Sequence, residues 1–363
     1  MNKLVYLDNA AGTKLYPEVI DSMTDVMKNH WGNASSNNSI GDDARRLIEN
    51  VRQQIAYDIN ASPEEIIFTS GACEANNLAL NRRNGVCTST IEHASIADIP
   101  YARAIYNVDH WGFVELKNVF AYETISITSA SGEIGTIQDI KTLAKKAHKK
   151  EGVIFHTDAT QLFPERRIDV KQLDIDMMSV SAQKFHGPRG VGFLYVKNGI
   201  DLNPIIYGSQ ENGMRAGTYD TAAIAGMGKA LDITRKNNPS AYVGFLRNEF
   251  LKMLLKMPGT HLNGANIGSQ RLENNISLTI DGVKAERLVT LCDLYGIIIA
   301  KGSACQSHIP TPSKTLKAIG LTDEQAFNTI RITLDEFNTW EEIEYAADII
   351  TKLVERIRNE KAD

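Results

Sequence analysis

Short apolar runs alternate with amphipathic stretches along most of the chain. The runs at 66–69, 87–91, 124–128 and 153–157 have the length of buried strands, and each is followed by polar residues. The stretches between them carry apolar residues at helical spacing. Strands that alternate with helices predict a parallel sheet covered on both faces, so we expect an α/β fold.

The two ends of the chain carry further predicted elements. Residues 5–7 predict a short strand and residues 8–13 a turn. A helix is expected to start near Pro17 and to have as its apolar face Val19, Ile20, Met23 and Met27. Thr339 and Glu342 form a capping box before a C-terminal helix whose expected core stripe is Ile343, Ile350, Leu353 and Ile357. We divide the chain into an N-terminal arm that packs with the small domain (1–15), a large domain (16–250) and a small C-terminal domain (251–363).

Composition narrows the class of protein. The chain has 363 residues, of which 43% are hydrophobic and 23% charged, so it can bury a sizeable core. A net charge of -5 argues against a nucleic-acid partner, and no apolar run reaches the ~20 residues of a membrane helix. The start lacks the apolar region of a secretory signal, so we expect a cytoplasmic protein. The cysteines are widely separated, which predicts neither a metal site nor disulfides.

Several chemically active side chains follow predicted strands. In open α/β sheets, ligands bind at the carboxyl ends of the strands, so His93, Asp158, Gln161 and Lys184 are candidates for one site. Lys184 ends an apolar run, and its amine can form a Schiff base with pyridoxal phosphate (PLP). A carboxylate such as Asp158 can keep the PLP ring nitrogen protonated, and a flat imidazole such as His93 can stack on the ring. Taken singly, each is more often an ordinary surface or structural residue, and only the combination favours a PLP site.

The turn at 70–72 is a candidate phosphate site. A strand runs into it and a helical pattern leaves it, so backbone N–H groups at a helix start lack intrahelical partners and can bind phosphate. The alternative is an ordinary strand-to-helix turn. The segment is neither a GxxxxGK[ST] loop nor a GxGxxG motif, which argues against nucleotide triphosphates and dinucleotides.

The chain resembles the cysteine desulfurases, which are fold-type I PLP enzymes of the class V aminotransferase group. The resemblance rests on nine segments in the family's order: YLDNAAGT, GNASSNNSIG, FTSGACEANNLAL, IEHASI, HTDATQ, SVSAQKFHGPRGVG, NGMRAGT, KGSACQS and IRITL. It implies a large domain with a mainly parallel seven-stranded sheet and a smaller α+β C-terminal domain.

The resemblance also implies roles for individual residues. Lys184 would carry the Schiff base, His93 would stack on the PLP ring, Asp158 would pair with the ring nitrogen and Gln161 would reach its phenolic oxygen. The phosphate would be held by Ser181, Gln183, Gly71, Ala72 and Cys73. Thr218 would reach the phosphate of the neighbouring subunit, which implies a homodimer.

A thiol in the C-terminal third distinguishes a desulfurase from a transaminase. Cys305 lies in a polar, proline-bearing segment, which predicts a loop on which a thiol can attack the sulfur of a substrate. The family's reaction converts L-cysteine to L-alanine and leaves the sulfur on this thiol as a persulfide for a sulfur-acceptor protein. The resemblance implies that Arg331 binds the substrate carboxylate, a role suited to a guanidinium because it can donate two parallel hydrogen bonds, and Asn33 is the other expected substrate-binding residue.

Five positions around the expected cofactor site depart from the family pattern: Asn38, Cys73, Ser131, Gly132 and Gln183. They leave two alternatives open. One is another PLP-dependent lyase or transaminase, including a selenocysteine lyase. The other is a divergent PLP-fold protein with little or no catalytic activity.

Overall fold

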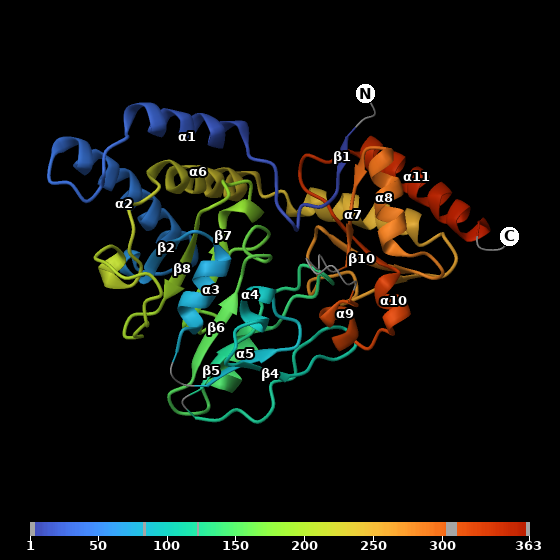
Figure 1. Cartoon of the computed structure of the whole chain (residues 1–363), viewed down its shortest axis with the longest axis horizontal. Helices are drawn as coiled ribbons and strands as arrows, with labels where there is room; N and C mark the ends of the chain where they lie inside the picture. The colour runs from blue at the N-terminus through green and yellow to red at the C-terminus, as the bar shows by residue number, and fades with distance from the viewer. Residues whose placement is uncertain (1–3, 83–84, 122, 303–310, 361–363) are drawn as a thin grey trace.

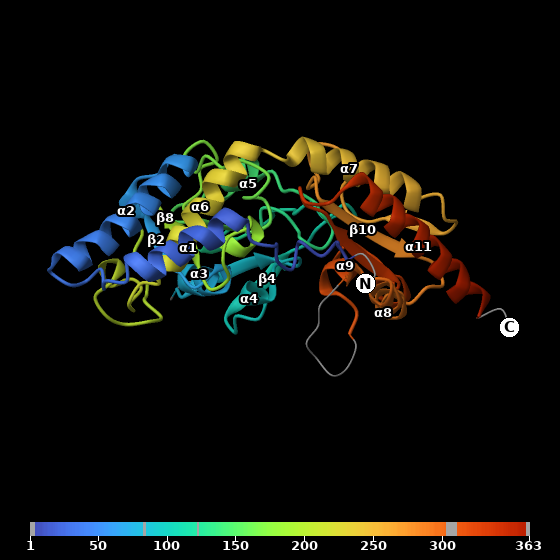
Figure 2. The same cartoon turned by 90° about the horizontal axis from the view of Figure 1, so that it is seen from above.

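The computed structural model describes residues 4–82, 85–121, 123–302 and 311–360, and they form two lobes (Figure 1). The larger lobe contains the elements from Pro17 to Asn237. The smaller lobe contains both the start and the end of the chain, so the N-terminal arm crosses from one lobe to the other (Figures 1 and 2).

A seven-stranded sheet runs through the large lobe in the order β2-β8-β7-β6-β5-β3-β4. All neighbouring pairs are parallel except those made by β8, which runs antiparallel to β2 and β7. The expected α/β fold with a mainly parallel sheet is therefore confirmed. The strands are β2 (Ile66–Thr69), β3 (Val86–Ser89), β4 (Ala102–Tyr106), β5 (Thr124–Ser126), β6 (Ile154–Asp158), β7 (Met177–Ser181) and β8 (Gly192–Val196).

Helices cover this sheet, and their buried faces follow the helical spacing of apolar residues. They are α1 (Pro17–Asn29), α2 (Ser39–Ile59), α3 (Ala72–Leu80), α4 (Ala94–Ala97), α5 (Ile140–Ala147) and α6 (Thr221–Asn237). The expected apolar face of α1 is partly wrong. Val19 and Val26 are buried, whereas Ile20 and Met27 are 52% and 59% exposed. The core stripe follows the spacing 19, 23 and 26, and Ile20 and Met27 lie about a quarter turn to one side of it, where they meet solvent.

The small lobe has a core of its own beneath two sheets. One is antiparallel in the order β12-β13-β10-β9, and the other is the parallel pair β1-β11. Val5 and Leu7 of the arm lie in this core, as does Val243 of α7. The elements are β1 (Val5–Tyr6), α7 (Ser240–Leu254), β9 (Thr260–Leu262), β10 (Asn275–Ile280), α8 (Ala285–Leu294), β11 (Ile297–Ile298), β12 (Ala300–Lys301), α9 (Lys314–Ala318), α10 (Asp323–Phe327), β13 (Thr329–Thr333) and α11 (Trp340–Asn359).

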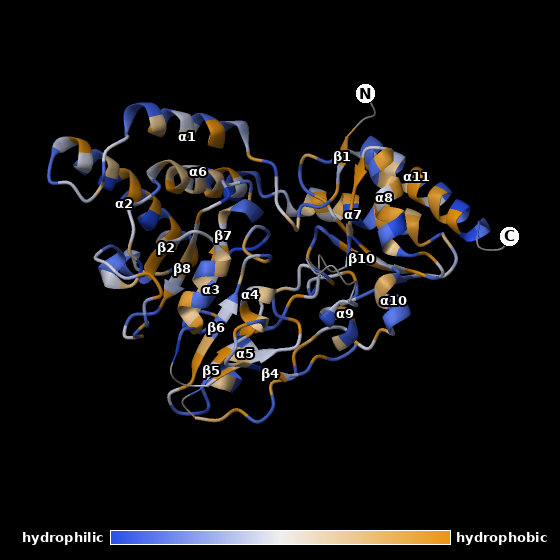
Figure 3. Cartoon of the chain, in the orientation of Figure 1, coloured by the Kyte–Doolittle hydropathy of each residue, from blue (hydrophilic) through white to orange (hydrophobic). Residues whose placement is uncertain are grey.

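Helix α11 begins with the predicted capping box between Thr339 and Glu342. Its predicted core stripe is buried, with Ile343, Ile350 and Ile357 each at 0% exposure. The hydropathy pattern agrees, since apolar residues gather on the inner strands and on one side of α11 (Figure 3). Within the described ranges, no helix is long and apolar enough to span a membrane.

Candidate active site

Lys184 lies where the two lobes meet. It ends the short 3-10 helix Ala182–Lys184 that follows β7, and its Nζ donates hydrogen bonds to the carbonyl oxygens of Ala10 (2.6 Å) and Ala11 (2.9 Å) in the arm. Burial and, to a smaller extent, the positive charge of Arg331 together lower the pKa of Lys184 to about 8. An appreciable fraction of this amine is therefore neutral near pH 8, as a nucleophile or base requires.

The side chain of Gln161 contacts the same arm. Its Nε2 donates to the carbonyl oxygen of Ala10 at 3.2 Å, so Gln161 and Lys184 share one acceptor. Gly132 packs against this amide, and a Cβ at position 132 would lie 2.8 Å from Gln161 Cδ. Glycine at position 132, where the sequence departs from the family pattern, therefore leaves the space that the Gln161 side chain occupies.

Asp158 ends β6 and is held by two donors. Asn76 Nδ2 donates to Oδ2 at 2.8 Å, and the backbone N–H of Thr160 donates to Oδ1 at 2.9 Å. Asn76 also donates to Ser95 Oγ at 2.9 Å, and Ser95 Oγ lies 2.9 Å from His93 Nδ1. These contacts link His93 to Asp158. Asn76 was not among the residues predicted from the sequence, because the complete burial of its amide appears only in the structure.

The candidate phosphate turn precedes α3. Gly71 has φ +140°, and a Cβ there would lie 3.4 Å from Ser181 Oγ at the end of β7. The first N–H groups of α3, beginning at Ala72, have no intrahelical partner. Cys73 is exposed and carries a free thiol. The turn therefore combines free backbone donors with one buried hydroxyl, which are the donors that a phosphate needs.

An ion pair ties this turn to the loop that carries Thr218. Glu74 accepts hydrogen bonds from the backbone N–H of Ser70 (2.8 Å) and from Arg215 Nε (2.7 Å). Arg215 holds the pKa of Glu74 below its ordinary value against the opposing effect of burial. Thr218 itself is exposed.

Arg331 projects from β13 toward the arm. Its Nη2 donates to Asp8 Oδ1 at 2.8 Å, and its Nε is buried without a hydrogen-bond partner among the described residues. The hydrogen bond to Asp8 orients the guanidinium through Nη2 and leaves the Nε–H donor free. A free, desolvated guanidinium donor suits a substrate carboxylate.

Of the four remaining predicted positions, three have local roles. Cys305 lies outside the described residues. Asn33 is exposed, accepts from the backbone N–H of Ser35, and belongs to the α1–α2 loop, which lies at the end of the large lobe remote from β10 (Figures 1 and 2). Asn38 Oδ1 caps α2 by accepting from Gly41 N–H at 2.9 Å. The backbone carbonyl of Gln183 accepts from Thr13 N–H at 3.0 Å, which anchors the arm.

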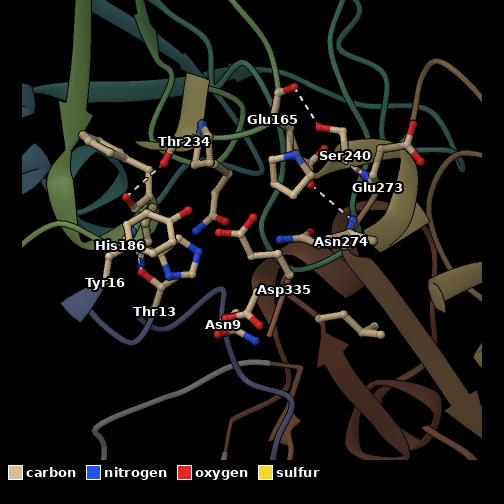
Figure 4. A pocket seen from close by; sticks show the side chains of 18 residues that line it. Asn9, Thr13, Tyr16, Glu165, His186, Thr234, Ser240, Glu273, Asn274 and Asp335 are labelled. Carbon is tan, nitrogen blue, oxygen red and sulfur yellow. Dashed lines mark hydrogen bonds between the residues drawn. The ribbon is translucent and has the colours of Figure 1, made fainter. Parts of the chain in front are cut away.

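A cavity of about 580 Å³, including its open mouth, is lined by Lys184 among other residues, and Figure 4 shows several of the side chains around it. It is bounded by the arm, by the link between α6 and α7, and by the chain after β13. Tyr16 and His186 pack there with ring centroids 4.4 Å apart, and burial raises the pKa of Glu165 to about 7.

The donor set around Lys184 fits PLP. A buried amine with a lowered pKa, a held carboxylate at Asp158, and free N–H groups at the start of α3 match the aldehyde, the ring nitrogen and the phosphate of that cofactor. The unpartnered Nε of Arg331 adds a site for a carboxylate.

Comparison with known proteins agrees with this arrangement. The family model described as aminotransferase class-V matches residues 5–346. The cysteine desulfurase IscS of Clostridium botulinum is 37% identical over 99% of this chain and 96% of the relative. A NifS-like protein from Rickettsia africae has a TM-score of 0.88 at 29% identity, covering 97% of this chain and 100% of that one. The structure described as SspA in complex with cysteine has a TM-score of 0.78 at 30% identity over 92% of this chain and 100% of that one. The chain therefore belongs to the class-V aminotransferase family and, within it, to the cysteine desulfurases.

Proposed function

We propose that the protein is a PLP-dependent cysteine desulfurase that converts L-cysteine to L-alanine and holds the sulfur on Cys305 as a persulfide. The observation that carries this proposal is the buried amine of Lys184, with Asp158 and the free donor of Arg331 around it. L-cysteine is also the molecule named in the SspA complex.

The cofactor would be held by residues from several strand ends. Lys184 would bind its aldehyde, Asp158 its ring nitrogen and Gln161 its phenolic oxygen, while His93 stacks on the ring. Its phosphate would lie between the start of α3, with Gly71, Ala72 and Cys73, and the side chains of Ser181 and Gln183. When bound, PLP supplies an electron sink that weakens bonds at the substrate's α and β carbons.

Side chains of the protein would bind the substrate, transfer protons and accept the sulfur. Arg331 binds the substrate carboxylate, and Asn33, which is remote from the small lobe of its own chain, would contact the substrate of the neighbouring subunit in the proposed dimer. Lys184, whose pKa is lowered to about 8, accepts the proton from Cα and returns one during product formation. The Cys305 thiolate attacks the substrate sulfur, the carbon–sulfur bond breaks, and one thiol plus L-cysteine become one persulfide plus L-alanine.

A homodimer would complete the site through Thr218. The large lobe exposes an apolar face on α1 and the loop after it, formed by Ile20 (52% exposed), Met27 (59%) and Trp31 (73%). Tyr207, on the loop that leads to Thr218, is 84% exposed. Apolar surface of this kind is stabilised when a second copy covers it.

The persulfide requires an acceptor. We propose that a thiol-bearing partner protein takes the sulfur in the cytoplasm and that iron–sulfur cluster assembly is its use. The charge of -5 and the absence of a membrane-spanning helix among the described residues are consistent with this setting.

The test is incubation of the PLP-loaded protein with L-cysteine, measuring alanine and protein-bound persulfide together. Cys305→Ala should keep the visible PLP band but lose persulfide and alanine formation. Lys184→Ala should lose the band that borohydride removes from the native protein. Full turnover by Cys305→Ala would favour another PLP lyase or transaminase, and the absence of any band would favour a binding protein without cofactor chemistry.

A further inference from the structure

The loop that joins β8 to α6 carries Thr218 and has little regular structure. It spans residues 197–220, all of which the structure describes, and contains one short 3-10 turn, Glu211–Gly213. A connection of this length without regular structure is usually either functional or disordered. The hydrogen bonds of a helix or a sheet do not fix its shape, so side-chain contacts must do so if Thr218 is to occupy one position.

The 3-10 turn has a strained backbone. Glu211, Asn212 and Gly213 have φ values of +48°, +54° and +81°. Glycine adopts this left-handed region at no steric cost, whereas two consecutive non-glycine residues there need support from the surrounding structure. Asn212 is exposed, but the Glu211 side chain is only 3% exposed. The buried side chain of Glu211 is therefore the point at which such support acts.

Arg52 of α2 binds the Glu211 carboxylate through two parallel hydrogen bonds. Nη1 donates to Oε2 at 2.9 Å, and Nη2 donates to Oε1 at 3.0 Å. The Arg52 side chain is 9% exposed, so the pair is buried on both sides. Burial acts to lower the pKa of Arg52, but the hydrogen bonds and the charge of Glu211 keep that pKa above its ordinary value. Removing either partner would leave an unpaired charge in the interior.

The Arg52 guanidinium is itself fixed against the large sheet. Its Cζ lies 4.6 Å from the centroid of the Phe68 ring, and Nη1 also donates to the carbonyl oxygen of Ile66. Ile66 and Phe68 belong to β2, the strand that leads into the candidate phosphate turn at 70–72. Through Arg52, the strained turn is therefore attached to the strand that also places the phosphate turn.

A second arginine attaches the loop closer to Thr218. Arg215 donates to both carboxylate oxygens of Glu74, from Nε at 2.7 Å and from Nη2 at 3.2 Å. The N–H of Gly217 donates to Gln210 Oε1 at 3.0 Å, which closes this part of the loop on itself. The exposed Thr218 thus follows directly on a segment that two ion pairs hold against the large lobe.

We propose that Arg52 is a positioning residue: by holding Glu211 it fixes the loop 205–218 in the shape that presents Thr218 to the neighbouring subunit. The inference rests on the proposed homodimer, in which Thr218 reaches the phosphate of the neighbouring subunit's cofactor. Arg52 acts on that phosphate only through the loop. An ion pair that merely stabilised the fold would affect the large lobe as a whole, whereas a positioning pair affects this loop and the contact made by Thr218.

The first test follows backbone hydrogen exchange in the cofactor-free, full-length protein. The double variant Arg52→Met with Glu211→Met replaces the pair by two apolar side chains, so no unpaired charge is left in the core and the variant keeps its fold. The peptide 205–218 should exchange about tenfold faster than in the native protein, while peptides from α2 and β2 exchange as before. Arg46→Met removes an exposed arginine of the same helix and should match the native protein.

Two results of this test would overturn the inference. Native exchange of peptide 205–218 in the double variant would show that packing alone fixes the loop. Faster exchange in all peptides, with a matching loss of stability in urea, would show that the pair is only a general stabiliser of the large lobe.

The second test is titration of the PLP absorption band, at a protein concentration at which light scattering shows the native dimer. The double variant and Thr218→Ala should each bind PLP about tenfold more weakly than the native protein. Combining all three substitutions should cost no more than Thr218→Ala alone, because Arg52 acts through that residue. Additive losses, a native affinity in Thr218→Ala or a monomeric native protein would each overturn the inference.

These measurements separate the inference from the proposed desulfurase activity. Neither exchange nor PLP titration involves cysteine or Cys305, so a native protein that binds PLP but forms no persulfide would refute the activity and leave the role of Arg52 to be decided by the two tests. If the native protein bound no PLP, the proposed function and the role of Thr218 would both fail, and exchange would still show whether Arg52 holds the loop.

Discussion

Arg331 Nη2 lies 2.8 Å from Asp8 Oδ1, so the arginine of β13 is paired with a carboxylate of the arm 323 positions away in the sequence. The arm reaches this point because β1 pairs with β11 and Leu7 is buried in the core of the small lobe. The pairing orients the guanidinium while its Nε stays free, so the arm takes part in the site.

Asp8→Asn should raise the KM for L-cysteine by about tenfold with a smaller change in kcat. A charge-assisted hydrogen bond contributes ~1.5–3 kcal/mol, and its loss lets Arg331 leave the orientation that binds the carboxylate. Steady-state kinetics of alanine formation provide the measurement. Asp348→Asn, which removes an exposed ion pair of α11, is the matched control. An unchanged KM would show that Asp8 does not orient the guanidinium.

The amine of Lys184 should titrate near pH 8 in the cofactor-free protein. Burial disfavours its charged form, and the charge of Arg331 adds to this effect. Competitive labelling with acetic anhydride across a pH series, read by mass spectrometry, should give a midpoint near that value. Arg331→Gln should move the midpoint upward, because it removes a positive charge. A native midpoint near the ordinary lysine value of ~10.4 would contradict the prediction.

Asn76→Ala should weaken both the fold and cofactor binding. The amide donates to Asp158 and to Ser95 at a fully buried position, so its removal takes the side-chain donor from Asp158 Oδ2 and breaks the connection between Asp158 and Ser95. We expect a loss of ~1–3 kcal/mol in the free energy of unfolding and about tenfold weaker PLP binding. Urea unfolding and titration of the PLP absorption band measure the two effects. Asn77→Ala removes the same group at an exposed position and should have a smaller effect on each.

Glu92 should make stability fall as pH rises. Burial raises the pKa of Glu92 to about 8 from an ordinary 4.5, so the folded protein keeps a proton that the unfolded chain releases. This contribution is fully present below about pH 4.5 and is lost as pH rises through about 8.

The check is urea unfolding of the native protein and Glu92→Gln at about pH 5 and about pH 9. The native protein should lose stability relative to Glu92→Gln between these values, because the glutamine carries no titrating proton. A difference that stays constant with pH would mean that Glu92 has no raised pKa in the folded state.

Local pattern was enough to predict much of the fold. The apolar runs locate β2, β3, β5 and β6 to within a few residues, because a buried strand needs apolar side chains on both faces. The capping box at Thr339 locates the start of α11 because its two side chains satisfy backbone donors within one turn. Contacts between residues that are close in the sequence can be predicted from the local sequence pattern.

The same local pattern selected the candidate residues at strand ends. Asp158 ends β6, and Lys184 follows β7, and these strands are neighbours in the sheet. Parallel strands bring their carboxyl ends to one edge, so residues far apart in sequence could be assigned to one site before their contacts were known.

Tertiary structure alone decided which side chains support that site. The pairing of Asp8 with Arg331, the hold of Asn76 on Asp158, and the pairing of Arg52 with Glu211 each join segments that no periodicity relates. The sequence determined strands, helices and their order, since these depend on neighbours along the chain. The partners of the charged and polar groups depend on how the arm and the two lobes pack together, because burial determines which groups lose water and need a protein partner.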